Sequence, residues 1–167
     1  MKISKPLVII FLVLAAVGFL DATYLTVEHY LGVIPPCVIA GGCSVVLTSE
    51  WSVVYGIPIA LLGSVYYLSL LILAVIYLKT RSTSENNGSE TLIVTASFTT
   101  IIGFLTSIFL VGLQLFVIKD ICFYCIISAI SSIALFVVGT LILLNYRRKI
   151  QTENHERLGR STASEIM

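Results

Sequence analysis

Long apolar runs alternate with short polar segments along the chain, and four of these runs are long. A helix needs about 20 predominantly apolar residues to cross the hydrocarbon core of a membrane. The four runs that meet this requirement extend over about Leu7–Leu31, Ile57–Leu78, Leu92–Ile118 and Ile121–Asn145. The pattern predicts an all-α integral membrane protein: residues 1–149 form a four-transmembrane-helix bundle, with a long loop between the first and second helices.

The third run contains polar side chains that do not break it. Hydroxyl groups can donate hydrogen bonds to carbonyls of their own helix, and small polar residues concentrate where membrane helices face one another. These residues are Ser97, Thr99, Thr100, Thr106, Ser107 and Gln114. We expect them on the face that is turned toward the other helices.

The first run has a competing interpretation. "MKISK" followed by "PLVIIFLVLAAVGFLDA" resembles a secretory signal peptide with a small-residue cleavage site. The apolar character continues beyond Asp21 through "TYLTVEHYL", however, which favours a retained helix.

Composition agrees with the membrane class. Of the 167 residues, 57% are hydrophobic and only 11% are charged, whereas soluble domains carry about 25% charged residues. The net charge is +1 and no basic stripe is present, so nothing indicates nucleic-acid binding. The last segment, residues 150–167, is polar, and we expect a solvated, mobile cytoplasmic tail.

The basic residues predict the orientation. Cytoplasmic loops of membrane proteins are enriched in Lys and Arg, and four helices with both termini inside place nearly all of them on that side. Those residues are Lys2, Lys5, Lys79, Arg81, Arg147, Arg148, Lys149, Arg157 and Arg160. The loop from about Gly32 to Gly56 has neither Lys nor Arg, so we expect it to be extracytoplasmic.

All four cysteines then lie on the extracytoplasmic side, where disulfides persist. Cys122 and Cys125 are three residues apart at the start of the fourth helix, a spacing that places two side chains on one face. A helix N-terminus stabilises a thiolate, so Cys122 is the better candidate for thiol exchange. Cys125 lies one turn deeper and would meet a molecule that is dissolved in the lipid.

Cys37 and Cys43 form a second pair in the long loop, within "PPCVIAGGCS". The two prolines stiffen the chain, whereas Gly41 and Gly42 loosen it just before Cys43. One mobile pair and one rigid pair suit a relay by thiol–disulfide exchange. Two inert structural disulfides, or a zinc site of four thiolates, are alternatives; zinc sites more usually show two short-spaced pairs in polar surroundings, and we expect no metal.

Three separated segments resemble the vitamin K epoxide reductase family. They are "DATYLTVEHY", "CSVVLTSEWSVVYGIPIALLG" and "DICFYCIISA", and the resemblance covers about Leu7–Asn145. It implies a four-helix bundle around a quinone and a short helix in the loop, lying over the bundle as a lid.

The resemblance also assigns roles to the cysteines. By position, Cys125 matches the quinone-facing cysteine and Cys122 its exchanging partner. Cys43 matches the loop cysteine that bonds transiently to Cys122, and Cys37 the one presented to an external thiol protein. Ser49 matches a loop serine near the site.

Two positions depart from the animal members, which hold the quinone oxygens with Asn and Tyr. Ile59 and Ala129 occupy these places. The departure favours the microbial, DsbB-like members, which oxidise a secreted thioredoxin-like (DsbA-like) protein and reduce a quinone of the ubiquinone, menaquinone or vitamin K type. We expect a monomer with a separate protein partner; reduction of vitamin K or its epoxide in the same site is the alternative.

Further candidate residues surround this site. Asp21 lies roughly 14 residues, or ~21 Å, past Leu7, level with the CxxC pair. It is a candidate proton donor or polar contact for the quinone, or a purely structural carboxylate. Trp51 and Tyr55 are candidates for a wall of the quinone site, or else interfacial anchors. A non-enzymatic alternative is a small transporter or scaffold with structural disulfides, in which Asp21 couples to a cation.

Overall fold

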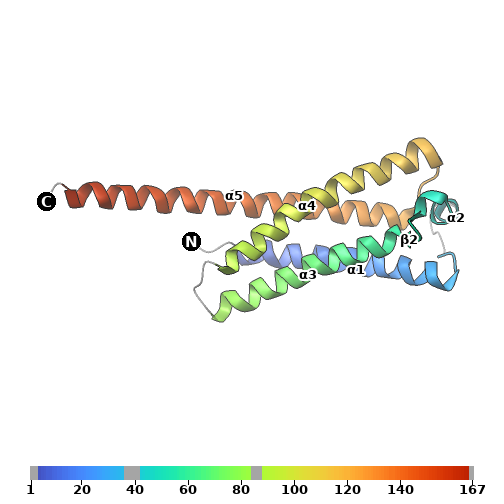
Figure 1. Ribbon diagram of the computed structural model, residues 1–167, viewed down its shortest axis with the longest axis horizontal. Coiled ribbons are helices and arrows are strands. Elements are labelled where there is room, and N and C mark those ends of the chain that lie inside the picture. The colour runs from blue at the N-terminus through green and yellow to red at the C-terminus, as the bar shows by residue number, and fades with distance from the viewer. Residues whose placement is uncertain (1–3, 36–41, 84–87, 166–167) are drawn as a thin grey trace.

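Four long helices run side by side in the computed structural model, which describes residues 4–35, 42–83 and 88–165 (Figure 1). They are α1 (Lys5–Leu31), α3 (Ile59–Thr83), α4 (Gly88–Gly112) and α5 (Phe123–Glu165). Within the described ranges, four segments are long and apolar enough to cross a membrane: Lys5–Leu31, Ile59–Thr80, Thr91–Ile118 and Phe123–Thr152. The predicted four-transmembrane-helix bundle is confirmed.

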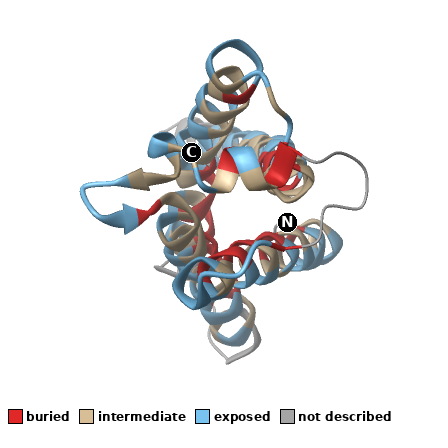
Figure 2. Cartoon of the chain, turned by 90° about the vertical axis from the view of Figure 1, so that its right-hand side faces the viewer, coloured by how far each residue is buried: buried red, intermediate tan, exposed pale blue. Residues whose placement is uncertain are grey.

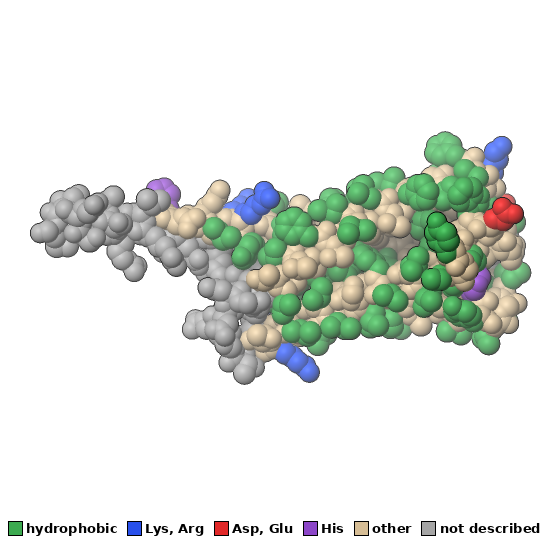
Figure 3. Space-filling model, in the orientation of Figure 1, with side chains coloured by type: hydrophobic (Ala, Val, Ile, Leu, Met, Phe, Trp, Pro, Cys, Tyr) green, Lys and Arg blue, Asp and Glu red, His purple; other side chains and the backbone are tan. Residues whose placement is uncertain are grey.

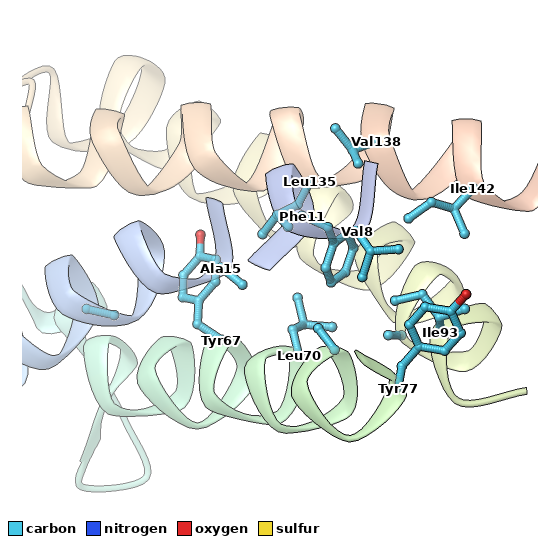
Figure 4. Packing of buried hydrophobic residues seen from close by; sticks show 13 residues of the cluster. Val8, Phe11, Ala15, Tyr67, Leu70, Tyr77, Ile93, Leu135, Val138 and Ile142 are labelled. Carbon is cyan, nitrogen blue, oxygen red and sulfur yellow. The ribbon is translucent and has the colours of Figure 1, made fainter. Parts of the chain in front are cut away.

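The bundle core is formed by apolar side chains from all four helices. Helix α1 packs against α3 and α5, and α4 packs against α5 and α3. Phe11, Leu70 and Leu135 point into the space between the helices and are fully buried (Figure 4). The outward faces are exposed (Figure 2) yet apolar, and the charged side chains visible in Figure 3 lie toward the two ends. Such an apolar outer surface matches a lipid environment.

Small residues let the helices approach one another. A Cβ atom on Gly18 would overlap the ring of Tyr67, so the tyrosine ring fills the space that the glycine leaves open. The Tyr67 hydroxyl then donates a hydrogen bond to the Ser128 carbonyl oxygen at 2.9 Å. Helices α1, α3 and α5 are thereby held together.

The connection from α1 to α3 carries the expected short helix, α2 (Gly42–Leu47). It is followed by the 3₁₀ turn η1 (Glu50–Ser52) and by a two-stranded antiparallel hairpin, β1 (Val53–Val54) and β2 (Ile57–Pro58). The hairpin turn has positive φ at Tyr55 (52°) and Gly56 (81°), as two-residue turns that match the strand twist require. These elements lie at the end of the bundle opposite the termini, which we call the loop end (Figure 1).

Helix boundaries differ from the expectation in several places. Helix α3 begins at Ile59 because the hairpin takes up Ile57 and Pro58. Helices α3 and α4 extend into the polar segment between the second and third spans, and only residues 84–87 lie outside the described part.

Helix α5 continues to Glu165, past residue 150, where we expected the polar tail to begin; the mobility of that tail stays a prediction. The segment "RRKIQTENHERL" is rich in strong helix formers and has no proline, so nothing stops the helix where the apolar run ends.

Helix α4 ends in a wider π-helical segment, η2 (Leu113–Ile118). Lys119 terminates it in a left-handed conformation (φ 60°). Toward the loop end, α4 and η2 diverge from α1 and α3 (Figure 1). Single π-helical turns occur frequently at functional sites, and this one directly precedes the CxxC pair.

Candidate functional site

Cys122 is the N-cap residue of α5. Its carbonyl oxygen accepts the first helical hydrogen bond, from the Ile126 N–H at 3.1 Å. Its Sγ accepts a hydrogen bond from the backbone N–H of Cys125 at 3.4 Å, in the position where a serine oxygen would normally cap a helix. The CxxC spacing therefore aims the first sulfur at the free N–H groups of the helix start.

This geometry favours the Cys122 thiolate. A hydrogen bond from the Cys125 thiol is the largest cause that lowers the pKa of Cys122, and the backbone N–H groups of Cys125 and Tyr124 act in the same direction. Burial and the charge of Asp21 oppose them without reversing the shift. Since the thiolate is the nucleophile in disulfide exchange, Cys122 is the sulfur prepared for it.

Cys43 packs against Cys122. Both side chains are fully buried, and they form one cluster with Val46. Cys43 is in a disulfide, whereas Cys122 and Cys125 are free thiols. The two residues of the expected transient Cys43–Cys122 bond therefore lie in the same buried cluster, and the bond itself stays a prediction. Cys37 lies outside the described residues.

Gly42 makes this contact possible, by a means that differs from the expected looseness. A Cβ atom at residue 42 would lie 2.8 Å from the Ile121 carbonyl oxygen and 2.9 Å from the Ile121 nitrogen. Only a glycine lets α2 approach the backbone beside Cys122 so closely. Gly41 lies outside the described residues.

A cavity of about 500 Å³ opens behind the CxxC pair, toward the bundle interior. It is lined by all four long helices, by α2 and by the loop around η1. Its walls are mainly apolar, and Cys125 is the one described cysteine that lines it. The predicted site residues that line it are Asp21, Ser49, Trp51, Ile59, Cys125 and Ala129.

Tyr55 lies apart from the other predicted site residues. It does not line the cavity, because it occupies the hairpin turn and its side chain is fully exposed. Tyr55 is therefore not part of the wall of this cavity, and the alternative, an interfacial anchor, stays a prediction.

Some polar groups of the cavity have hydrogen-bond partners in the structure and others have none among the described residues. Ser49 donates its hydroxyl hydrogen bond to the Val46 carbonyl oxygen at 2.7 Å, so it serves to end α2. Asp21 Oδ2 and Glu28 Oε2 are buried and find no hydrogen-bond partner among the described residues. Both carboxyl groups line the cavity from the same face of α1. Unsatisfied buried oxygens of this kind are available to a ligand.

Sequence reasoning assigned no role in the site to Gln114. This buried residue of η2 lines the cavity, and its Oε1 accepts a hydrogen bond from the Cys122 backbone N–H at 3.2 Å. The signal in the sequence is a single amide in an apolar span, eight residues before Cys122. The role of this amide could not be predicted from the sequence, because it depends on the π-helical segment η2. That segment buries Gln114 and leaves Phe116 and its neighbours exposed.

The arrangement separates two faces of one dithiol pair. Cys122 faces the disulfide-bonded loop cysteine, and Cys125 faces an apolar cavity. Electrons passed between these two sulfurs would cross from the loop to the cavity. Among the described residues no three His, Cys, Asp or Glu side chains gather as metal ligands.

Comparisons with known proteins give one match. The model of the vitamin K epoxide reductase family matches residues 9–140, which is more than half of the chain. No curated protein matches it.

Proposed function

The chain belongs to the vitamin K epoxide reductase family, a family of membrane oxidoreductases, and from this premise we propose that it generates disulfides in a separate, extracytoplasmic thioredoxin-like protein. A quinone is the electron acceptor. The observation that carries the proposal is the placement of the CxxC pair. Cys122 shares a buried cluster with the loop cysteine Cys43, and Cys125 lines an apolar cavity.

The first exchange takes place at the loop. A reduced partner dithiol passes two electrons to the Cys37–Cys43 disulfide; the partner leaves as a disulfide and the loop becomes a dithiol. In its thiolate form, Cys43 then attacks the Cys122 sulfur of an oxidised CxxC pair. The Cys43–Cys122 bond forms, the Cys122–Cys125 bond breaks, and Cys125 departs with the electron pair.

The second exchange restores the loop. Cys37 attacks Cys43, the loop disulfide forms again, and Cys122 leaves as a thiolate. The hydrogen bond from Cys125 and the N-cap position make Cys122 a good leaving group. The CxxC pair is now a reduced dithiol. Cys122 and Cys125 are free thiols in the structure as well.

The cavity fits the quinone that this scheme needs. Its volume of about 500 Å³ lies within the usual range for small-molecule sites. Ile59 and Ala129 offer apolar surface, and Asp21 brings an unsatisfied carboxyl oxygen. When bound, a quinone accepts two electrons and two protons and leaves as quinol.

The energetic requirement supports an acceptor of this class. Strongly oxidising disulfide carriers have potentials near roughly −120 mV, so their own oxidant must be more positive. A lipid-soluble quinone of sufficiently positive potential meets this requirement. We assign Asp21 the role of a proton donor or polar contact at the quinone, because its buried oxygen has no partner among the described residues.

A reconstituted assay tests the proposal. Purified chain in liposomes that contain ubiquinone or menaquinone receives a reduced thioredoxin-like protein, and quinone reduction is followed by absorbance. Wild-type protein turns over and Cys125→Ala falls to background. Cys37→Ala loses turnover with the protein donor but keeps turnover with a small dithiol. Unchanged turnover in Cys125→Ala would contradict the proposal.

The alternatives give different results in parallel assays. Turnover of vitamin K epoxide, with no oxidation of the protein donor, would indicate the animal-type reaction. Function that survives Cys125→Ala and is abolished by Asp21→Asn would indicate a transporter. The apolar side chains of Ile59 and Ala129 offer no hydrogen bond to an epoxide oxygen, which counts against epoxide reduction and favours the oxidase.

A further inference from the structure

We propose that Gln114 is a positioning residue that serves both cysteines of the CxxC pair: its carbonyl oxygen holds the Cys122 backbone, and its amide N–H groups stabilise the thiolate of Cys125 during exchange. This inference rests on the proposed function and deepens it. It assigns a role to the one buried polar side chain of η2.

The first part of the proposal, that Gln114 holds the Cys122 backbone, follows from a hydrogen bond in the structure. The Cys122 N–H lies in front of the first turn of α5, where no carbonyl of that helix can accept its hydrogen bond. Gln114 Oε1 accepts it at 3.2 Å. Because Gln114 is only 6% exposed, water does not replace this bond readily. The start of α5 is therefore tied to η2 at the residue that must meet Cys43.

The second part of the proposal, that Gln114 stabilises the Cys125 thiolate, follows from the N–H groups of the same side-chain amide. An amide carries two N–H donors besides its oxygen. The Gln114 oxygen is held at the Cys122 N–H, one helical turn before Cys125. Gln114 and Cys125 both line the cavity. One side chain thus spans the two ends of the CxxC segment.

The need for a donor arises in one step of the cycle. When Cys43 attacks Cys122, the Cys122–Cys125 bond breaks and Cys125 carries the electron pair into a mainly apolar cavity. An anion that is buried without a hydrogen bond is strongly disfavoured. In its carboxylate form, Asp21 has the same sign of charge as this sulfur and does not stabilise it. The Gln114 amide lines the same cavity and offers neutral N–H donors for the departing sulfur.

The π-helical turn explains how an apolar span can supply this group. Leu115, Phe116 and Val117 are all exposed toward the lipid side, whereas Gln114 is buried. The extra residue in a π turn changes the face that the preceding side chain occupies. Residue 114 is thereby directed at the CxxC pair while its successors remain apolar and outward.

Alkylation rates test the inference without any quinone. In a Cys122→Ala background, which leaves Cys125 without its partner as in the mixed disulfide, Cys125 reacts with iodoacetamide at neutral pH. We expect Gln114→Met to slow this reaction by at least about tenfold, the loss that follows from removing a hydrogen bond to a charged group. The matched control is Thr106→Val, which removes an exposed polar group from the same span and leaves the rate unchanged.

A second background separates donation from anchoring. With Cys125→Ala, the alkylation of Cys122 should change much less on Gln114→Met, by under about threefold. Equal slowing of both cysteines would show that Gln114 only holds the helix start, and the donor assignment would be wrong. An unchanged Cys125 rate would overturn the whole inference.

Gln114→Asn covers the case in which Gln114→Met does not fold. It keeps an amide but is one methylene too short to reach both cysteines, so the Cys125 rate should again fall, and a wild-type rate would overturn the proposal. The proposed function fails by a different result. Absence of quinone reduction in the wild type would contradict the oxidase and leave the alkylation difference intact.

Discussion

At the scale of single residues, the two sulfurs of the CxxC pair carry negative charge at different moments. In the reduced pair the charge belongs to Cys122, which receives hydrogen bonds from the Cys125 thiol and from the helix start. In the mixed disulfide Cys122 is bonded to Cys43, so the charge passes to Cys125. The neighbours of each sulfur suit the state in which it is charged.

The pH dependence of Cys122 reactivity checks this assignment. A lowered pKa keeps the thiolate populated below the pH at which an ordinary cysteine becomes protonated, so alkylation of Cys122 should persist toward lower pH. Cys125→Ala removes the largest cause of the lowering, and the midpoint of the alkylation profile should move to higher pH. The measurement is the rate of iodoacetamide reaction across pH, with peptide mapping of the labelled cysteine. A midpoint that stays in place would contradict the hydrogen bond as the cause.

At the scale of elements, α2 and the start of α5 behave as one unit. Cys43 in α2 and Cys122 at the N-cap of α5 share a buried cluster, and Gly42 brings the two backbones together. The rigid neighbour at Gly42 is backbone, which cannot move aside as a flexible side chain would. The close approach of α2 therefore depends on the absence of a Cβ at one residue.

Gly42→Ala should weaken the exchange between the loop and the CxxC pair. Overpacking against a rigid neighbour costs about 1–3 kcal/mol, so formation of the Cys43–Cys122 mixed disulfide should slow by at least about fivefold. In a Cys37→Ala, Cys125→Ala background, added diamide oxidises the two remaining thiols, Cys43 and Cys122, to the mixed disulfide, and gel mobility over time measures how fast this trapped species forms.

The control for this experiment is Gly112→Ala, where the added Cβ meets nothing within 4 Å. The control should form the mixed disulfide at the unaltered rate. Equal rates in Gly42→Ala and the parent background would show that the close approach is not required.

At the scale of the whole molecule, the apolar belt and the placement of charge suggest one orientation. The loop end carries α2, the hairpin and the CxxC pair, whereas both termini lie toward the opposite end (Figure 1). The basic residues that follow the fourth span lie on the terminal side, which is cytoplasmic if the usual Lys and Arg bias holds. The loop end is then extracytoplasmic, where a disulfide-forming relay has its substrates.

Labelling of introduced cysteines tests this orientation. In a cysteine-free background, Tyr55→Cys at the fully exposed hairpin turn should react with a membrane-impermeant maleimide in intact cells. Asn154→Cys should react only after the membrane is permeabilised, because this exposed residue lies beyond the fourth span, which ends at Thr152. The reverse pattern would place the thiols in the cytoplasm and remove the proposed role.

Length and hydropathy alone determined the four spans, because a chain with these apolar runs has no other way to satisfy its backbone hydrogen bonds in lipid. The position of the CxxC pair at the start of the fourth helix could also be predicted, because its geometry depends only on neighbouring residues in the chain. Hydropathy marks where the apolar run ends, but not where the helix ends, and α5 continues through the polar segment to Glu165.

Only the tertiary structure decided which residues meet. The contact of Cys43 with Cys122, the turn of η2 that buries Gln114, and the exclusion of Tyr55 from the cavity all join or separate segments far apart in the chain. Hydrophobic periodicity records how much of a residue is buried, but it does not record against what. The physical reason is that burial is a property of one position, whereas a contact depends on how two packed elements are placed in space.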